Sequence, residues 1–278
     1  MKITDTIKTL GKVVLKSRPA GRSTGNGKGK SLIVMGNGPS LRETISKFPD
    51  ILTGHDTMAV NFAANTPEFS RLRPGHYILA DPHFVDKEDP NVRKLWENLA
   101  GADRPMTLHL PVGMQAPELP ANIRVSRYNM TPAEGYDGVC HALYAKGLAV
   151  PRPRNVLIPA LMEGIREGYD EIWIVGADHT WPHTLYVDDR NRVVTVQPHF
   201  YEENPKELDR IAEAYAGVHI HDVLGSMSVA FRSYHAIRRY ADKVGVKIWN
   251  ATPGSLIDAF ERKKLEEIRQ KWGRTDTP

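Results

Sequence analysis

Continuous apolar runs alternate with amphipathic segments along most of the chain, a pattern typical of buried parallel strands joined by crossover helices. The first run, residues 31–35, ends in a glycine-rich turn and precedes a helical pattern over 41–48. Such alternation predicts an α/β fold, namely a Rossmann-like, doubly wound and mostly parallel sheet with helices on both faces. Further strands are expected at 57–60, 76–80, 106–110, 123–126, 171–175 and 246–249. Further helices are expected at 92–99, 138–146, 155–167, 207–215, 223–243 and 255–267.

The N-terminal segment precedes this alternation. Ile3, Ile7, Leu10 and Val14 are spaced three and four residues apart, which predicts a short amphipathic helix. A stretch rich in glycine, serine and basic residues follows and indicates a flexible linker. We therefore divide the chain into an N-terminal helix with a flexible basic linker, a Rossmann-like domain and a basic C-terminal tail, at 1–30, 31–262 and 263–278.

One internal segment also departs from the pattern. Asp188-Asp189-Arg190-Asn191 separates two β-rich runs within 185–196, which predicts a hairpin or an ordered excursion. Excursions that follow the carboxyl end of a strand often cover a site. We expect a lid-like excursion near residues 179–204.

Composition and charge narrow the class of protein. The 278 residues are 41% hydrophobic, and no stretch approaches the roughly 20 consecutive apolar residues of a membrane-spanning helix. Cys140 is the single cysteine, which excludes an intrachain disulfide and favours a role in core packing. No secretory signal is apparent, so we expect a cytoplasmic protein. No nucleic-acid-binding module or basic stripe with aromatics is present, so nucleic acid is not an expected partner.

The net charge of +4 suits acidic ligands, and the basic residues gather at the two ends of the chain. Such ends could rest peripherally on the inner face of an anionic membrane, or could simply be solvated helix faces and a tail. A homo-oligomer is left open, because the sequence does not encode the oligomeric state in any readable form.

The candidate chemistry lies where predicted strands end. In open α/β sheets, ligands bind at the carboxyl ends of the strands. The turn Gly36-Asn37-Gly38-Pro39-Ser40 follows the first strand; its glycines would admit a ligand close to the backbone, with free N–H groups and a helix N-terminus to hold oxygens. The turn has no Walker lysine and no third glycine of the dinucleotide fingerprint. It predicts an anion or nucleotide site, with a plain strand-to-helix turn as the alternative.

Polar residues follow other predicted strands as well. Asn61 comes after the second strand, Asp81 after the third, and Asp178 and Thr180 after the strand at 171–175. A single such residue is usually a helix cap or a turn former, but the recurrence favours a site. Asp81 and Asp178 could ligate a metal ion, yet no closely spaced cluster of histidines and carboxylates supports one, so we expect none.

Three histidines in or beside the excursion are candidate general bases. His179, His183 and His199 could each abstract a proton from a hydroxyl near neutral pH. Sequence does not choose among them, because a base is defined by its geometry. His219 and His221 alternate with other residues as in a short strand or sheet edge, and we give them little weight.

The order and spacing of these motifs from about residue 31 to residue 262 resemble bacterial sialyltransferases of glycosyltransferase family 42. The same signatures are similar to a wider superfamily that includes flagellin-modifying motility accessory proteins and archaeal 6-hydroxymethylpterin diphosphokinases. The residues that carry the resemblance are Gly36 to Leu41, Asn61, Asp81-Pro82, Gly168-Tyr169, Glu171 to Asp178, and Ala251 to Leu256.

The resemblance implies a metal-independent, inverting transfer from a CMP-activated nonulosonic acid to a glycan or glycolipid, with no cofactor. It implies that Gly36, Asn37 and Asn61 hold the nucleotide, with Gly38, Ser40, Thr180 and Ser255 near it. His199 is the closest counterpart of the catalytic histidine, and Tyr186 is the closest counterpart of a tyrosine that assists departure of the CMP phosphate. Thr180 or Trp181 stands in the place of the first tyrosine of the family's pair, and Tyr201 could replace either one. Asp178 is a further catalytic candidate, and Asp81 a further candidate for binding the donor.

The sequence also departs from the family. Asp81 stands where the family has asparagine, and its negative charge beside a CMP-sugar is unfavourable, so the donor could differ. Two other interpretations therefore stay open. One is a diphosphokinase-like transferase that uses ATP and Mg²⁺, and the other is a nucleotide-binding accessory protein without turnover.

Overall fold

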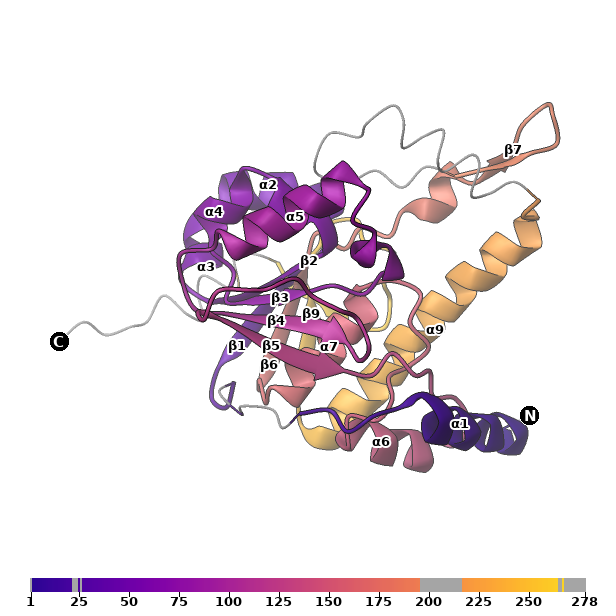
Figure 1. The fold of residues 1–278 in the computed structure, drawn as a ribbon. Helices are drawn as coiled ribbons and strands as arrows, with labels where there is room; N and C mark the ends of the chain where they lie inside the picture. The colour runs from indigo at the N-terminus through magenta and orange to yellow at the C-terminus, as the bar shows by residue number, and fades with distance from the viewer. Residues whose placement is uncertain (1, 22–24, 26, 196–216, 265–266, 268–278) are drawn as a thin grey trace.

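The computed structural model describes residues 2–21, 25, 27–195, 217–264 and 267, and it contains a central eight-stranded sheet (Figure 1). The strand order is β10-β9-β6-β1-β2-β3-β4-β5, and every adjacent pair is parallel. The expected Rossmann-like α/β fold is confirmed. The strands are β1 (Ser31–Met35), β2 (Asp56–Val60), β3 (His76–Ile78), β4 (Met106–Pro111), β5 (Ile123–Tyr128), β6 (Glu171–Val175), β9 (Lys247–Asn250) and β10 (Glu261–Arg262).

Helices cover both faces of the sheet because successive strand side chains point to opposite sides. Leu32 and Val34 of β1 pack into one core cluster, whereas Ile33 and Met35 pack into the other. The first cluster, which includes Cys140, lies against α6 (Asp137–Ala145), α7 (Leu157–Arg166) and α9 (Ile220–Val244). The second lies against α2 (Ser40–Lys47), α3 (Pro49–Thr53), α4 (Glu68–Leu72) and α5 (Pro90–Ala100).

The order of the strands creates a switch point beside β1. The chain adds β2, β3, β4 and β5 in turn on one side of β1, and then returns to place β6 on the other side. Connections therefore diverge at the carboxyl ends of β1 and β6, which is where open α/β sheets form a ligand crevice.

The segment 255–262 is not the helix that its pattern predicts. Asn250 donates from Nδ2 to the carbonyl of Ile257 (3.1 Å), and the amide of Ile257 donates to the hydroxyl of Ser255 (3.2 Å). Leu256 donates its amide to the carbonyl of Asp178 (3.0 Å). These bonds take backbone groups that a helix would need, and the chain instead forms a loop that leads into β10.

Two further expectations concern segments near the lid. The hairpin is confirmed, because β7 (Tyr186–Val187) pairs antiparallel with β8 (Val193–Val194). His219 is not in a strand; it caps the N-terminus of α9, where its partner in a capping box is Asp222. The helix expected at 207–215 lies outside the described residues.

The N-terminal helix α1 (Lys2–Lys16) forms as its pattern predicts and lies at the edge of the domain beside α6 (Figure 1). Ser17, which follows it, donates its hydroxyl to the carbonyl of Leu148 (2.7 Å). Arg18 donates its amide to Asn129 Oδ1 (3.0 Å), so the start of the expected linker is bonded to the domain. Among the residues that the structure describes, no helix is long and apolar enough to span a bilayer.

Candidate functional site

Two glycine turns pack against each other at the switch point, one after β1 and one after β6. The amide of Gly36 donates to the carbonyl of Val175, and that of Gly38 donates to the carbonyl of Gly176, each at 2.8 Å. A Cβ atom on Gly36 would lie 2.4 Å from the carbonyl oxygen of Gly176, closer than real Cβ contacts. The glycines are therefore required for the close approach of the two turns.

Asp178 joins the turn after β6 to α2, the helix that follows β1. Its Oδ2 accepts a hydrogen bond from the hydroxyl of Ser40 (2.8 Å), and its Oδ1 accepts one from the amide of Ser40 (3.3 Å). Ser40 is the first residue of α2, so the carboxylate lies where the positive end of the helix dipole favours negative charge. The chain itself thus supplies the anion at this helix N-terminus.

This arrangement corrects the expectation that the turn leaves its amides free for a ligand. The amides of Gly36, Gly38 and Ser40 all donate to groups of the protein. The packing brings Gly36, Gly38, Ser40 and Asp178 together as expected, but it engages their polar groups with one another. Whether any of them contacts a ligand stays a prediction.

Two asparagines beside these turns have unsatisfied amide oxygens. Asn37 donates from Nδ2 to the carbonyl of Val60 (3.2 Å), which places it next to Asn61 at the end of β2. The Oδ1 atoms of Asn37 and Asn61 are buried and have no hydrogen-bond partner among the described residues. Asn61 also has a φ of 48°, a left-handed conformation that is uncommon for a residue other than glycine. Buried unsatisfied groups and backbone strain both concentrate at functional sites.

Other residues predicted for the site have structural partners. Ser255 is 1% exposed and donates its hydroxyl to the carbonyl of Ala177 (2.7 Å), so it lies behind the β6 turn. Asp81 is exposed and caps a short 3₁₀ helix, η2 (Pro82–Val85), by accepting from the amide of His83. Thr180 is half-buried and precedes another 3₁₀ helix, η3 (Trp181–Thr184), which begins the excursion.

His179 is buried in an aromatic pocket. Its Nε2 lies 2.6 Å from the hydroxyl of Tyr234, and its ring stacks on that of Trp181 with centroids 4.2 Å apart. Burial lowers the pKa of His179 to about 3, so the imidazole is neutral at physiological pH. A group with so low a pKa accepts a proton only weakly, which makes His179 a poor general base. The residue has a φ of 53°, which turns the chain sharply after β6.

The structure gives positions for only some of the remaining catalytic candidates. Tyr186 is 54% exposed on β7, and His183 is exposed in η3. His199 and Tyr201 lie outside the described residues. The roles inferred for these residues stay predictions.

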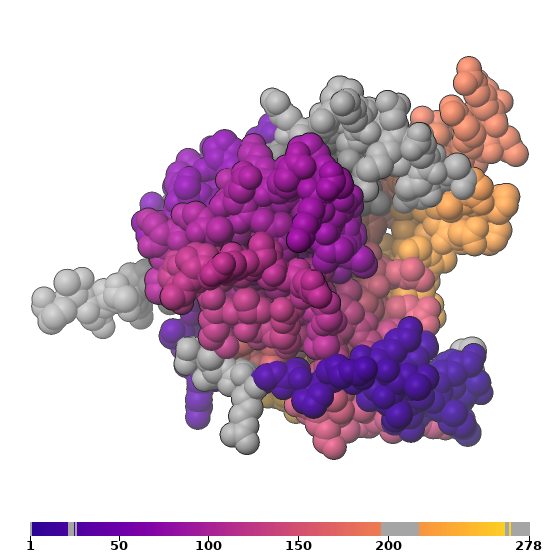
Figure 2. Space-filling model, in the orientation of Figure 1, coloured from indigo at the N-terminus to yellow at the C-terminus, as the bar shows by residue number. Residues whose placement is uncertain are grey.

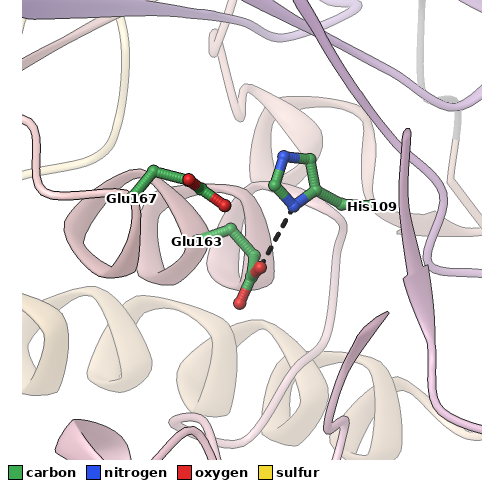
Figure 3. Close-up of side chains that lie close together, drawn as sticks. All are labelled: His109, Glu163 and Glu167. Carbon is green, nitrogen blue, oxygen red and sulfur yellow. Dashed lines mark hydrogen bonds and ion pairs between the residues drawn. The ribbon is translucent and has the colours of Figure 1, made fainter. Parts of the chain in front are cut away.

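A buried cluster that sequence reasoning missed lies between β4 and the C-terminal part of α7. Nitrogen and oxygen atoms of His109, Glu163 and Glu167 lie within 4.8 Å of one another, and Figure 3 shows the two carboxylates on one helix facing the ring. Glu163 and Glu167 are four residues apart and so share one face of the helical segment, a signal readable in the sequence. His109 reaches them from the middle of β4.

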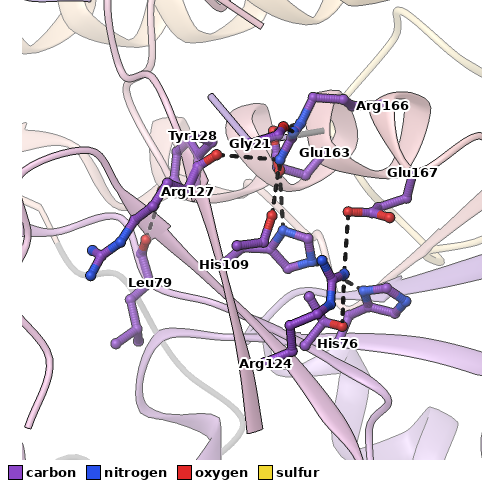
Figure 4. Close-up of polar contacts among 12 residues, drawn as sticks. Gly21, His76, Leu79, His109, Arg124, Arg127, Tyr128, Glu163, Arg166 and Glu167 are labelled. Atoms are coloured by element: carbon purple, nitrogen blue, oxygen red, sulfur yellow. Dashed lines mark hydrogen bonds and ion pairs between the residues drawn. The ribbon is translucent and has the colours of Figure 1, made fainter. Parts of the chain in front are cut away.

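His109 and Glu163 belong to a longer chain of polar contacts, part of which Figure 4 shows. Tyr169 donates its hydroxyl to Asp56 (3.0 Å) and lies 2.9 Å from Nε2 of His76. Nδ1 of His76 lies 3.1 Å from Nε2 of His109, whose Nδ1 lies 3.1 Å from a carboxylate oxygen of Glu163. Burial, and to a smaller extent the neighbouring His109, lowers the pKa of His76 to about 4.

The hydrogen-bond directions along this chain are coupled. If Tyr169 donates to Asp56, then His76 donates to Tyr169 through Nε2, and its neutral ring accepts from His109 through Nδ1. Arg166 donates from Nε to Glu163 (2.8 Å) and places a positive charge beside this buried carboxylate.

A metal ion would have to compete with this arrangement. Arg166 already donates to the carboxylate of Glu163, Nδ1 of His109 lies 3.1 Å from it, and Arg124 lies 3.8 Å from the carboxylate of Glu167. We therefore interpret the cluster as an ion-pair network that ties α7 to the sheet. A pocket of about 210 Å³ nearby, between α6, α7 and α9, lies away from the switch point; it is lined in part by Tyr144, Arg166 and Tyr240.

The parallel sheet and the paired turns at its switch point define a Rossmann-like α/β protein. No family model matches the sequence, and no curated protein matches it. Among solved structures, the chain is similar to the MAf glycosyltransferase from Magnetospirillum magneticum AMB-1, with a TM-score of 0.51 at 11% sequence identity. The match covers 95% of this chain and 40% of that chain, so the protein spans well under half the length of its neighbour. At this identity the likeness establishes the fold.

Proposed function

We propose that the protein is a glycosyltransferase that moves a nonulosonic acid or similar sugar from a CMP-activated donor to a surface glycan or glycolipid. The transfer inverts the configuration of the sugar and needs no metal ion. The similarity in fold to a glycosyltransferase supports the broad class, and it does not favour the sialyltransferase family in particular. The observation that carries the proposal is the pair of unsatisfied amide oxygens at the switch point, on Asn37 and Asn61.

Two buried acceptors call for a ligand that brings hydrogen-bond donors. The hydroxyls of a ribose and the exocyclic amine of a cytosine are such donors, and a carbonyl or phosphate oxygen is not. The left-handed backbone at Asn61 holds its side chain at the end of β2, beside Asn37. We therefore place the nucleoside of the donor at these two asparagines, with the backbone of Gly36 and Gly38 beside it.

The carboxylate of Asp178 excludes one common position for a phosphate. Because it already accepts from the amide of Ser40, a phosphate at the N-terminus of α2 would meet a negative charge there. The donor phosphate would then lie toward the excursion, where Tyr186 and Tyr201 assist its departure. We take His199, the counterpart that the resemblance implies, as the base that deprotonates the acceptor hydroxyl, with His183 as the alternative; the pKa of about 3 disfavours His179.

A thermal-shift screen with CMP, CDP, UDP, GDP and ATP, each with and without Mg²⁺, tests the donor. A ligand that binds only the folded state raises the melting temperature, so stabilisation by CMP or CDP without metal supports the proposal. Stabilisation only by ATP with Mg²⁺ overturns it in favour of the diphosphokinase-like transferase. No shift with any nucleotide overturns the assignment of a donor.

Asn61→Gly tests the placement of the nucleoside, because glycine keeps the left-handed backbone and removes the amide. We expect it to abolish the CMP shift. The matched control is Arg73→Gly, since Arg73 has the same φ of 48° at the exposed end of α4. An unchanged CMP shift in Asn61→Gly would contradict the placement.

Turnover is tested by release of CMP from a CMP-activated sugar in the presence of glycan acceptors, with His199→Ala as the variant. Loss of release with retained CMP binding supports catalysis by His199. If wild type binds CMP but His199→Ala changes nothing in any assay, the protein is a nucleotide-binding accessory protein without turnover.

A further inference from the structure

The N-terminal helix α1 lies on the outside of the domain (Figure 2); it turns two threonines and Val13 toward the protein and leaves its other apolar residues exposed. Thr6 and Thr9 are 9% and 2% exposed, and both contact the loop that precedes α6. The hydroxyl of Thr9 donates to the carbonyl of Glu134 (2.8 Å) and accepts from its amide (2.9 Å). The amide of Tyr136 donates to the hydroxyl of Thr6 (3.0 Å). These hydrogen bonds and the packing of Val13 together attach the helix to the domain.

Four apolar residues of α1 form one exposed stripe, whereas Val13 packs against the first core cluster and Leu15 is exposed outside the stripe. Ile3, Ile7, Leu10 and Val14 are 61%, 65%, 44% and 79% exposed. Their spacing of four, three and four residues puts them on one side of the helix, next to the side that the threonines bind. An amphipathic helix of a globular protein ordinarily buries this stripe in its own core. None of the described residues covers it here.

The charges of α1 indicate which kind of surface would cover the stripe. Lys2, Lys8, Lys12 and Lys16 outnumber the single acidic residue of the helix, Asp5. At about 100° per residue, Lys8 and Lys12 fall on the half of the helix opposite the stripe. An apolar stripe backed by a lysine-rich face is the pattern of helices that lie in the plane of an anionic bilayer. A second copy of the helix would bring like charges together, whereas anionic headgroups attract them.

We propose that α1 docks the protein on the surface of an anionic lipid bilayer, with the stripe of Ile3, Ile7, Leu10 and Val14 inserted below the headgroups. The threonine bonds fix the helix to the domain, so docking also orients the sheet relative to the membrane. The inference is independent of the proposed function and would hold for any ligand at the switch point.

Co-sedimentation of the full chain with lipid vesicles tests the proposal. Wild type is expected to pellet with vesicles of phosphatidylcholine containing about 30% phosphatidylglycerol, and to do so less as salt rises or when phosphatidylglycerol is left out. Ile7→Asp is expected to lower the partition coefficient by about tenfold or more, because it puts a charge in the middle of the inserted stripe. The double variant of Lys8→Glu and Lys12→Glu should lower binding to anionic vesicles only.

The matched control is Leu224→Asp, since Leu224 is 49% exposed on α9 and lies outside the stripe. It should bind vesicles like wild type. Ile7 is exposed, so circular dichroism should give the same melting temperature for Ile7→Asp as for wild type.

Three results would overturn the proposal. Wild type could stay in the supernatant with anionic vesicles, or Ile7→Asp could pellet as wild type does. Light scattering could also show a wild-type dimer that Ile7→Asp dissociates, without any binding to vesicles, which would assign the stripe to a second copy of the chain.

Discussion

The carboxylate of Asp178 accepts hydrogen bonds from both the hydroxyl and the amide of Ser40, a residue 138 positions earlier in the sequence. These bonds join the turn after β6 to the first turn of α2 across the switch point. They also place a negative charge at the N-terminus of a helix, which stabilises that helix. The relationship makes Asp178 a residue that positions the glycine turns.

The Asp178 and Ser40 bonds predict coupled losses of stability. Asp178→Asn and Ser40→Ala should each lower the free energy of unfolding by about 1–2 kcal/mol, because each removes part of a charge-assisted hydrogen bond. The double variant should lose about 1 kcal/mol less than the sum of the two single variants, since the same bond is removed twice. Urea unfolding of the four proteins measures the coupling, and strictly additive losses would contradict it.

Gly38→Ala should be strongly destabilising, because its Cβ would lie 2.0 Å from Oδ2 of Asp178 and 2.7 Å from the carbonyl oxygen of Gly176. We expect a loss of about 3 kcal/mol in the free energy of unfolding, since backbone must move to relieve the overlap. Gly225→Ala is the control, because nothing lies within 4 Å of a Cβ at that position in α9. It should be neutral or should stabilise by up to about 1 kcal/mol. Equal effects of the two substitutions would refute the argument from close packing.

His179 predicts a loss of stability in acid. Burial holds the pKa of His179 at about 3, whereas the unfolded chain binds this proton near its ordinary value of 6.5. Below pH 6.5 the unfolded state therefore binds more protons than the folded state, so stability falls as pH falls and levels off near pH 3. Between pH 7 and pH 5 this histidine accounts for a loss of about 2 kcal/mol.

The measurement is urea unfolding at pH 7 and pH 5. His179→Gln should lose about 2 kcal/mol less than wild type between these two pH values. The exposed His183 is the control, and His183→Gln should keep the wild-type difference. The prediction fails if His179→Gln and wild type lose the same amount of stability.

The buried network around α7 predicts a large cost for removing one of its charges. Glu163→Gln leaves Arg166 and His109 without their charged partner, so we expect a loss of about 3–5 kcal/mol in the free energy of unfolding. The exposed pair of Glu43 and Lys47 on α2 gives the control. Glu43→Gln should cost less than about 1 kcal/mol because water solvates both groups. A loss of similar size in both variants, measured by urea unfolding, would argue against the network.

The sequence by itself determined the elements that depend on local pattern. The apolar runs that became β1 and β6 are buried on both faces, and this burial is written into consecutive residues. The glycines of the turn after β1 and the hairpin around Asp188 were also predicted from neighbouring residues. The predicted order of strands and helices was enough to give the class of fold.

The tertiary structure decided what each polar group contacts. The helical pattern at 255–262 gave way to a loop because Asn250 and Ser255 bind its backbone. The amides of the Gly36–Ser40 turn look free in the sequence, yet they donate to the turn after β6. Neither contact follows from residue type, since both depend on which strand lies next to which.

Helices α1 and α7 show the same difference between what local pattern predicts and what tertiary contacts decide. Periodicity fixes that α1 has an apolar side, but only the tertiary contacts of Thr6, Thr9 and Val13 decide that this side faces outward. Periodicity also puts Glu163 and Glu167 on one face of a helical segment, but only the pairing of strands brings His109 to them. Local sequence sets the pattern along one element, whereas partners come from distant segments, whose meeting depends on the packing of the whole chain.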